Sequence, residues 1–189
     1  EKRMAGLPAE VATRIHPVKA DMADFGLEPR FDRIIVPYNG LYCLLDDARL
    51  DACLRLAASH LAPGGRLVAD GYVTFATDPD FEEEDEDDDD AWMTVVQHEG
   101  HDVEVIERCD WKRKEQFAEA SYTYLLPDGE GNIQERVGRI PQRYLSAEQL
   151  RVALEKACFS EQRWFGDFEE TPFDDQSQTM IVVAEKQPI

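Results

Sequence analysis

The stretch RFDRIIVPYNGLYCLL, residues 30–45, contains the change of pattern on which the fold prediction rests. Residues 31–36 form a near-continuous apolar run with little alternation. Such a run is typical of a parallel strand that is covered on both faces. It ends at Pro37, Tyr38, Asn39 and Gly40, which are turn-forming or chain-breaking residues. We therefore expect a buried parallel strand whose C-terminal end turns abruptly out of the sheet.

A helix and a second strand follow this stretch. Asp46 or Asp47 can cap a helix, and apolar residues recur at helical spacing between Leu50 and Leu61. The Pro-Gly-Gly turn at residues 63–65 ends the helical pattern. Residues 66–69 then form a second short apolar run. Strand, helix and strand in this order predict a βαβ unit and hence an α/β fold.

The segments on either side of the βαβ unit suggest further strands. Upstream, residues 11–20 have strand-like content, although Pro17 restricts them to an edge strand or an imperfect ladder. Downstream, residues 92–140 alternate and are rich in Val, Ile, Tyr and Thr. A hairpin turn is expected at residues 128–132. Residues 92–140 therefore predict an antiparallel sheet, added after a loop-like segment at residues 72–91.

The C-terminal part returns to a mixed pattern. Ser146 and Gln149 form a capping box before an apolar helical face, and residues 161–168 and 180–184 are expected as strands. The pattern divides the chain into a core of residues 1–71 and 141–189 and an insertion of residues 72–140.

Charge and cysteine content limit the classes of partner. The net charge is −20, and residues 82–90 alone contain nine acidic side chains. Such a field repels phosphates, which argues against nucleic acid and anionic membranes as partners. A solvated loop is the expected role of the acidic run. Four cysteines without a CxxC pair, and no long apolar run, suggest a reduced cytoplasmic protein without a membrane span.

Candidate metal ligands are few. His98 and His101 flank Glu99, but Gly100 places them at an expected hairpin turn and no further ligands cluster nearby. We therefore expect no metal site. The sequence also contains no convincing catalytic triad or activated cysteine, which argues against a hydrolase.

The segments ADMADFG (20–26), RFDRIIVPYNGLYCLL and LRLAASHLAPGGRLVADG (54–71) together resemble the second half of the class I S-adenosylmethionine-dependent methyltransferase fold. Residues 143–186 are similar to the C-terminal part of the small bacterial branch of that family. The resemblance covers residues 10–70 and 140–187. It implies an α/β, Rossmann-like, mostly parallel sheet that is incomplete at the N-terminus and carries an inserted antiparallel β-sheet.

The resemblance also implies a binding site at the C-terminal ends of the strands. Asp21 would accept a hydrogen bond from the adenine amino group of S-adenosylmethionine, and Met22 would pack on the adenine ring. Pro37, Tyr38 and Asn39 would lie near the methionine end of the cofactor. A simple turn role for Asn39 remains open.

Substrate contacts are expected from a second set of residues. The junction before the capped helix lies near the rim of the site in this family, so Arg143 and Tyr144 are candidate substrate contacts. Tyr42 is another candidate. Tyr38 and Tyr42 could instead be ordinary packing aromatics.

The family's first strand and its Gly-rich loop are not matched here. The only G-x-G, at residues 129–131, falls in the expected hairpin. The family's strand order, 3-2-1-4-5-7-6, would leave a gap beside strand 4 without strands 1 and 2. We therefore expect either an upstream strand-helix-strand segment in the natural protein or a rearrangement of residues 12–20, such as a swap between chains.

Two functions remain open from the sequence. The first is methyl transfer from S-adenosylmethionine to an N, O or C nucleophile of a small molecule, with S-adenosylhomocysteine as product. The second is a non-catalytic methyltransferase-like module that binds or dimerises. In either case residues 92–140 could cover a substrate, form a homodimer interface, or do both.

Overall fold

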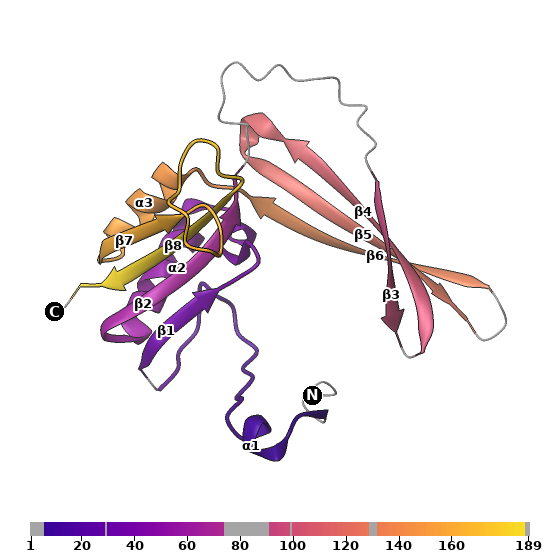
Figure 1. The fold of residues 1–189 in the computed structure, drawn as a ribbon, viewed down its shortest axis with the longest axis horizontal. Helices are drawn as coiled ribbons and strands as arrows, with labels where there is room; N and C mark the ends of the chain where they lie inside the picture. Colours follow the sequence, from indigo (N-terminus) through magenta and orange to yellow (C-terminus); the bar gives the residue numbers. More distant parts are fainter. Residues whose placement is uncertain (1–5, 29, 74–90, 99, 129–131, 188–189) are drawn as a thin grey trace.

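The structure is a computed structural model that describes residues 6–28, 30–73, 91–98, 100–128 and 132–187. Its strands form two four-stranded sheets (Figure 1). The first sheet has the order β1-β2-β8-β7 and the second the order β3-β4-β5-β6. The strands of the first sheet are β1 (Phe31–Val36), β2 (Leu61–Tyr72), β7 (Phe159–Phe165) and β8 (Thr179–Lys186). Those of the second are β3 (Trp92–His98), β4 (His101–Lys112), β5 (Phe117–Pro127) and β6 (Ile133–Arg143).

The predicted βαβ unit is confirmed. β1 leads through the short 3-10 helix η2 (Gly40–Cys43) into α2 (Asp47–His60), and β2 pairs with β1 in parallel. Asp46 caps α2, since its carboxylate accepts the Arg49 N–H at 2.8 Å. β2 begins at Leu61 rather than at the expected residue 66, because the chain is already extended where the helix ends.

The first sheet is mixed rather than mostly parallel, which corrects the expectation from the sequence. β8 pairs antiparallel with both β2 and β7. The reason is connectivity: the β1-to-β2 connection is a helical crossover, whereas the chain between β7 and β8 turns straight back. The order β1-β2-β8-β7 still agrees with the 4-5-7-6 half of the strand order that the resemblance implied.

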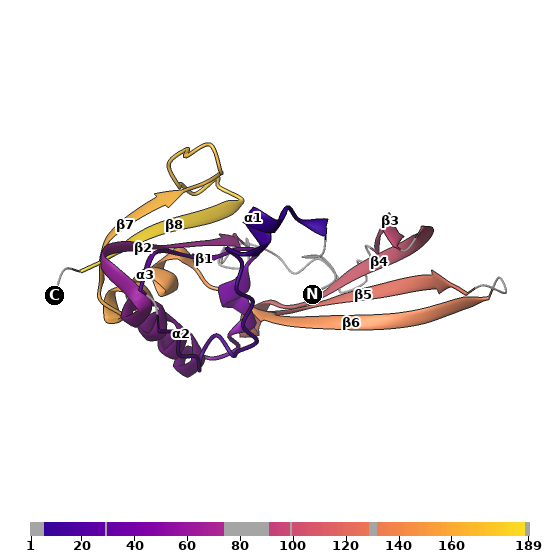
Figure 2. The ribbon, with the colours of Figure 1, turned by 90° about the horizontal axis from the view of Figure 1, so that it is seen from below.

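Both helices of the core pack on one face of the first sheet (Figure 2). α3 (Ala147–Lys156) begins with the predicted capping box of Ser146 and Gln149. Leu54 of α2 and Leu154 of α3 pack in one cluster with Leu67 of β2. The prediction that β1 is covered on both faces was wrong, because β1 is an edge strand and Ile35 on it is 65% exposed.

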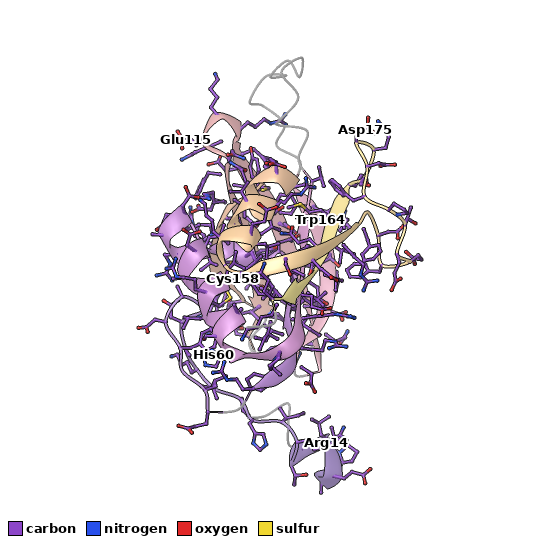
Figure 3. All side chains as sticks on the ribbon, turned by 90° about the vertical axis from the view of Figure 1, so that its left-hand side faces the viewer. Arg14, His60, Glu115, Cys158, Trp164 and Asp175 are labelled. Carbon is purple, nitrogen blue, oxygen red and sulfur yellow. The ribbon has the colours of Figure 1, made fainter. Side chains whose placement is uncertain are left out.

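The N-terminal part lies apart from this core. Residues 11–20 form no strand, contrary to the prediction; a single helical turn, α1 (Ala9–Ala12), precedes an extended segment. α1 buries no residue, and Arg14 lies away from the packed side chains in Figure 3. Strand-like composition is not sufficient here because none of the described strands pairs with this segment. Within the described ranges, no helix is both long and apolar enough to cross a membrane.

The second sheet confirms the predicted antiparallel insertion. Three antiparallel pairings join β3 to β6, and the sheet extends away from the first one (Figure 1). The expected hairpin is present, because the β5–β6 ladder continues to the pair Pro127 and Ile133. Residues 129–131 of that hairpin and the acidic run at 82–90 lie outside the described residues. β6 continues to Arg143, so one strand crosses the expected boundary at residue 140.

Candidate cofactor and substrate site

The loop after β1 has an unusual backbone. Tyr38 and Asn39 have φ angles of 58° and 55°, in the left-handed region that residues other than glycine rarely adopt. Each costs about 1 kcal/mol relative to an ordinary conformation. The Asp70 carboxylate at the end of β2 accepts the N–H of Tyr38 at 3.0 Å and that of Asn39 at 3.3 Å. A single acidic side chain on the adjacent parallel strand therefore holds both left-handed residues in place.

The Asn39 side chain completes this connection. Its Oδ1 accepts the N–H of Tyr72, two residues after Asp70, at 3.0 Å. We call these three hydrogen bonds the Asp70 clamp. Asp70 was not among the predicted site residues. Its position at the C-terminal end of the second parallel strand was the available signal, because ligands bind beyond such ends in open α/β sheets.

The clamp separates the roles of the three predicted loop residues. Asn39 uses its amide oxygen to bind the backbone of Tyr72 on β2, so this atom holds the loop in place. The Tyr38 side chain is 89% exposed, so its ring is available to a ligand. Pro37 begins the turn, since its carbonyl accepts the N–H of Gly40 at 3.2 Å.

Asp21 lies against the first turn of α2. Its two carboxylate oxygens accept hydrogen bonds from Arg49 Nη2 at 2.8 and 2.9 Å, and one also accepts the N–H of Ala23. The bond from Arg49, followed by that from Ala23, lowers the pKa of Asp21. Met22 is half-buried and packs against the core cluster. The two predicted adenine contacts therefore occupy adjacent but different environments, one polar and one apolar.

His60, at the end of α2, holds the segment that follows Asp21 in the sequence beside this helix. Its Nε2 accepts the N–H of Leu27 at 2.9 Å, and its ring lies 4.8 Å from that of Phe25. Because Nε2 accepts, Nδ1 carries the proton and donates to the Leu56 carbonyl at 2.8 Å. The segment therefore runs beside α2 and places Asp21 at the same end of the helix as the loop after β1.

The predicted substrate contacts Tyr42 and Tyr144 are both only 1% exposed. The Tyr42 hydroxyl donates to the Tyr72 carbonyl at 2.8 Å, and burial raises its pKa. The Tyr144 hydroxyl donates to the Arg113 carbonyl at 3.2 Å. The structure thus places both predicted substrate contacts in the packed interior.

These tyrosines belong to an aromatic cluster with Tyr72 and Trp111. The Tyr72 ring lies 4.9 Å from Tyr42, 5.8 Å from Trp111 and 6.4 Å from Tyr144, measured between ring centroids. Since Trp111 is on β4 and Tyr72 on β2, the cluster joins the two sheets. Tyr72 also donates its hydroxyl to Gln142 of β6 at 3.0 Å.

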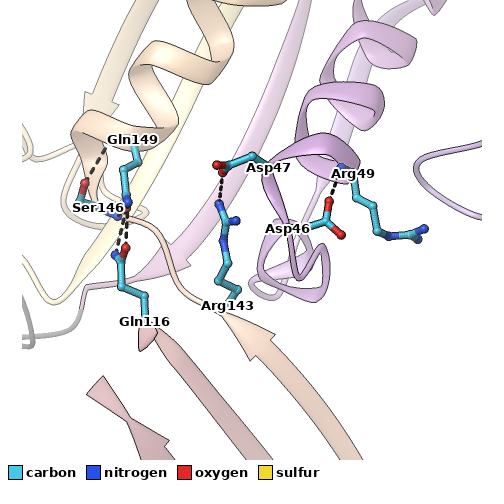
Figure 4. A network of polar contacts seen from close by, with 7 residues as sticks. All are labelled: Asp46, Asp47, Arg49, Gln116, Arg143, Ser146 and Gln149. Atoms are coloured by element: carbon cyan, nitrogen blue, oxygen red, sulfur yellow. Dashed lines mark hydrogen bonds and ion pairs between the residues drawn. The ribbon is translucent and has the colours of Figure 1, made fainter. Parts of the chain in front are cut away.

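Arg143 takes part in a polar network at the N-terminal ends of the two helices (Figure 4). Its guanidinium pairs with Asp47, and this bond lowers the pKa of Asp47. Gln116 exchanges amide hydrogen bonds with Gln149 of the capping box at 3.0 and 2.8 Å. A cavity of about 300 Å³ between α2 and α3 is lined by both Asp47 and Arg143. Arg143 is therefore already engaged by an acidic partner.

The part of the chain that the structure describes contains no evident metal site. No group of three His, Cys, Asp or Glu side chains there could hold an ion. Cys53 and Cys109 have pKa values raised to about 11, with burial as the main cause, so neither is an activated thiolate.

No family model matches the sequence, and no curated protein matches it. Solved structures do match. The CcbJ methyltransferase from Streptomyces caelestis is 21% identical, with a TM-score of 0.70 over 98% of this chain and 72% of its own. The sugar N-methyltransferase KedS8 from Streptoalloteichus sp ATCC 53650 is 23% identical, with a TM-score of 0.67 over 89% of this chain and 61% of its own.

A third match is the S-adenosylmethionine-bound CalS10 from Micromonospora echinaspora, described as an amino pentose methyltransferase. It is 21% identical, with a TM-score of 0.63 over 88% of this chain and 63% of its own. The chain thus spans between 61% and 72% of the length of these three proteins. At such identities the likeness concerns the fold, and over most of its length the chain matches class I S-adenosylmethionine-dependent methyltransferases in structure.

Proposed function

We propose that this chain contributes to methyl transfer from S-adenosylmethionine to an N, O or C nucleophile of a small molecule. The observation that carries the proposal is the Asp70 clamp, which holds two strained residues at the C-terminal end of a parallel strand. Backbone strain that neighbouring groups maintain is characteristic of ligand sites. In a sheet of this type, that end is where ligands bind.

The cofactor would supply an electrophilic methyl group, so the protein has mainly to orient the nucleophile and exclude water. We assign Asp21 and Met22 to the adenine, and Pro37, Tyr38 and Asn39 to the methionine end. A carboxylate offers about four lone-pair positions. Asp21 uses three of them for Arg49 and Ala23, which leaves one for an adenine amino group.

For the substrate, we propose that the exposed Tyr38 ring makes direct contact. Tyr42 and Tyr144 would act from within the aromatic cluster, by fixing the second sheet beside the strand ends. Arg143 would orient the N-terminal ends of α2 and α3 through Asp47. A net charge of −20 favours a neutral or cationic small molecule over nucleic acid.

The outer edge of β1 is relevant to cofactor binding. Among the described residues, β1 pairs with β2 alone. In the strand order that the resemblance implies, a further strand lies at that edge. We propose that a strand–helix–strand segment completes the site there, provided by an upstream part of the natural protein or by another chain.

Calorimetric titration of S-adenosylmethionine and S-adenosylhomocysteine tests the proposal on this chain and on an N-terminally extended form. We expect binding by the extended form and its loss in Asp70→Ala. Asp32→Ala, an exposed carboxylate on β1, is the matched control and should bind normally. If neither form binds either compound, methyl transfer is excluded and the alternative, a non-catalytic binding or dimerisation module, replaces it.

A further inference from the structure

β3, one edge of the second sheet, has an unusual composition. Its sequence, WMTVVQH, contains no Asp, Glu, Lys or Arg, whereas each of the other seven strands in the described part of the chain contains at least one. Charged residues make up 32% of the whole sequence. Four apolar side chains of β3 are exposed: Trp92 by 71%, Met93 by 63%, Val95 by 56% and Val96 by 42%. An uncharged, apolar and unpaired strand edge favours association with another strand.

The other sheet edges differ from β3 in this respect. β6, at the opposite edge of the same sheet, contains Glu135, Arg136 and Arg139, and Pro141 lacks a backbone donor. β7, at the edge of the first sheet opposite β1, also carries charged side chains. Charges and proline are the usual means by which edges are kept from pairing. Their absence is therefore specific to β3.

We propose that β3 pairs antiparallel with β3 of a second copy of this chain, across a two-fold axis at Val95. In this register Val95 faces its own copy, Met93 faces Gln97, and Trp92 faces His98. The exposed backbone groups of both edges would be satisfied, and the two sheets would become one continuous eight-stranded sheet. Apolar side chains of both copies would lie side by side on each face.

Charge explains why a second copy fits this edge. Two chains of net charge −20 repel each other unless the contact surface itself is uncharged. Within the sheet, the acidic side chains closest to β3, such as Glu104 and Glu107, lie on the neighbouring strand β4. In the paired sheet the two β4 strands are three strand spacings apart, about 14 Å. This exceeds the Debye length of about 8 Å at physiological salt, so their repulsion is screened.

The antiparallel direction also separates the N-terminal ends of the two β3 strands, each of which follows an acidic run in the sequence. Each run ends at Asp90, just before β3. The proposed register places the two Trp92 residues six positions apart along the ladder, or about 20 Å. A parallel pairing would place the two Trp92 residues side by side. A two-fold axis is also the symmetry by which one surface can complement itself.

The mass of the chain in solution, measured by light scattering across a dilution series, tests the proposal. We expect a dimer that Val95→Lys converts to a monomer, because two ammonium groups would meet on the axis. Val137→Lys on the β6 edge is the matched control, since Val137 is 51% exposed, and should leave the dimer intact. Circular dichroism confirms that both variants fold.

Oxidative cross-linking tests the register itself. The Val95→Cys variant should form a disulfide-linked dimer, since facing residues in an antiparallel pair have Cα atoms about 5.5 Å apart, within disulfide range. Val137→Cys should not cross-link. A chain that stays monomeric at its highest soluble concentration overturns the proposal. So does a dimer unaffected by Val95→Lys, or capture of an unrelated peptide at β3 in place of a second copy.

Discussion

Replacing Gly71 by alanine tests how tightly β2 is packed beside the candidate site. A Cβ atom built at Gly71 would lie 2.5 Å from the Tyr42 hydroxyl oxygen and 2.8 Å from Cζ of the same ring. Real Cβ contacts essentially never fall below 3.0 Å, so Tyr42 would have to move. The Tyr42 side chain is only 1% exposed and its hydroxyl is bonded to the Tyr72 carbonyl. It has little room in which to move.

The expected cost has two parts. Inserting a methyl group into a packed interior costs about 1–3 kcal/mol. Moving the Tyr42 hydroxyl away from its carbonyl acceptor adds about 1 kcal/mol. Gly71→Ala should therefore lower the free energy of unfolding by about 2–4 kcal/mol. For a chain of this length that corresponds to a fall in Tm of roughly 5–15 °C.

Urea unfolding followed by circular dichroism measures this cost. Gly138→Ala on β6 is the control, because its added carbon meets no atom closer than 4.0 Å and should change stability little. Tyr42→Phe removes the closest atom, so the double variant with Gly71→Ala should be more stable than the sum of the two single changes predicts, by at least about 0.5 kcal/mol. Additive effects, or equal stability of the Gly71 and Gly138 variants, would show that this contact does not limit the packing.

Three further changes have defined outcomes. Ser146→Ala removes the α3 cap and should cost about 1 kcal/mol in urea unfolding; an unchanged midpoint would contradict the cap. Arg49→Ala should raise the pKa of Asp21 in a carboxyl NMR titration, because the bond from Arg49 lowers that pKa in the unchanged protein. The ion pair therefore stabilises the fold at pH values above the pKa that Asp21 has in the unfolded chain. This contribution is lost as the pH falls through the pKa of Asp21 in the folded chain. Cys53 is buried and its pKa is raised to about 11, so it should resist alkylation at neutral pH until the chain is unfolded. The exposed Cys158 should react in the native state. Equal alkylation rates of the two thiols in the folded chain would contradict the burial of Cys53.

Local signals in the sequence predicted much of the fold. The caps at Asp46 and Ser146 and the hairpin that joins β5 and β6 all depend on a few neighbouring residues, and the structure confirms them. The alternation of apolar and polar residues in 92–140 is also a local pattern, and it predicted the antiparallel sheet. Such features do not depend on which distant segment lies nearby, so they can be predicted from a single sequence.

Features that depend on distant partners were predicted less well. Residues 11–20 have the composition of a strand but have no strand to pair with, and they remain outside the sheets. The apolar run of β1 suggested burial on both faces, yet its position at the sheet edge leaves Ile35 exposed. Asp70 was overlooked because its role depends on a loop 31 residues earlier in the chain. In each of these three cases, the structure of a segment was decided by the segments that lie next to it in space and not by its own sequence.

The same contacts connect the candidate site to the inserted sheet. Asn39 binds the backbone of Tyr72, and the Tyr72 side chain reaches Gln142 of β6 and the Trp111 ring of β4. A displacement of the second sheet would therefore act on the strained loop after β1 through Tyr72. Pairing of β3 across a two-fold axis would restrict that sheet, since β4 pairs with both β3 and β5. The proposed dimer interface and the proposed cofactor site would then be coupled through Tyr72. Tyr72→Phe, which removes only its hydroxyl bond to Gln142, would weaken this coupling while leaving the Asp70 clamp in place.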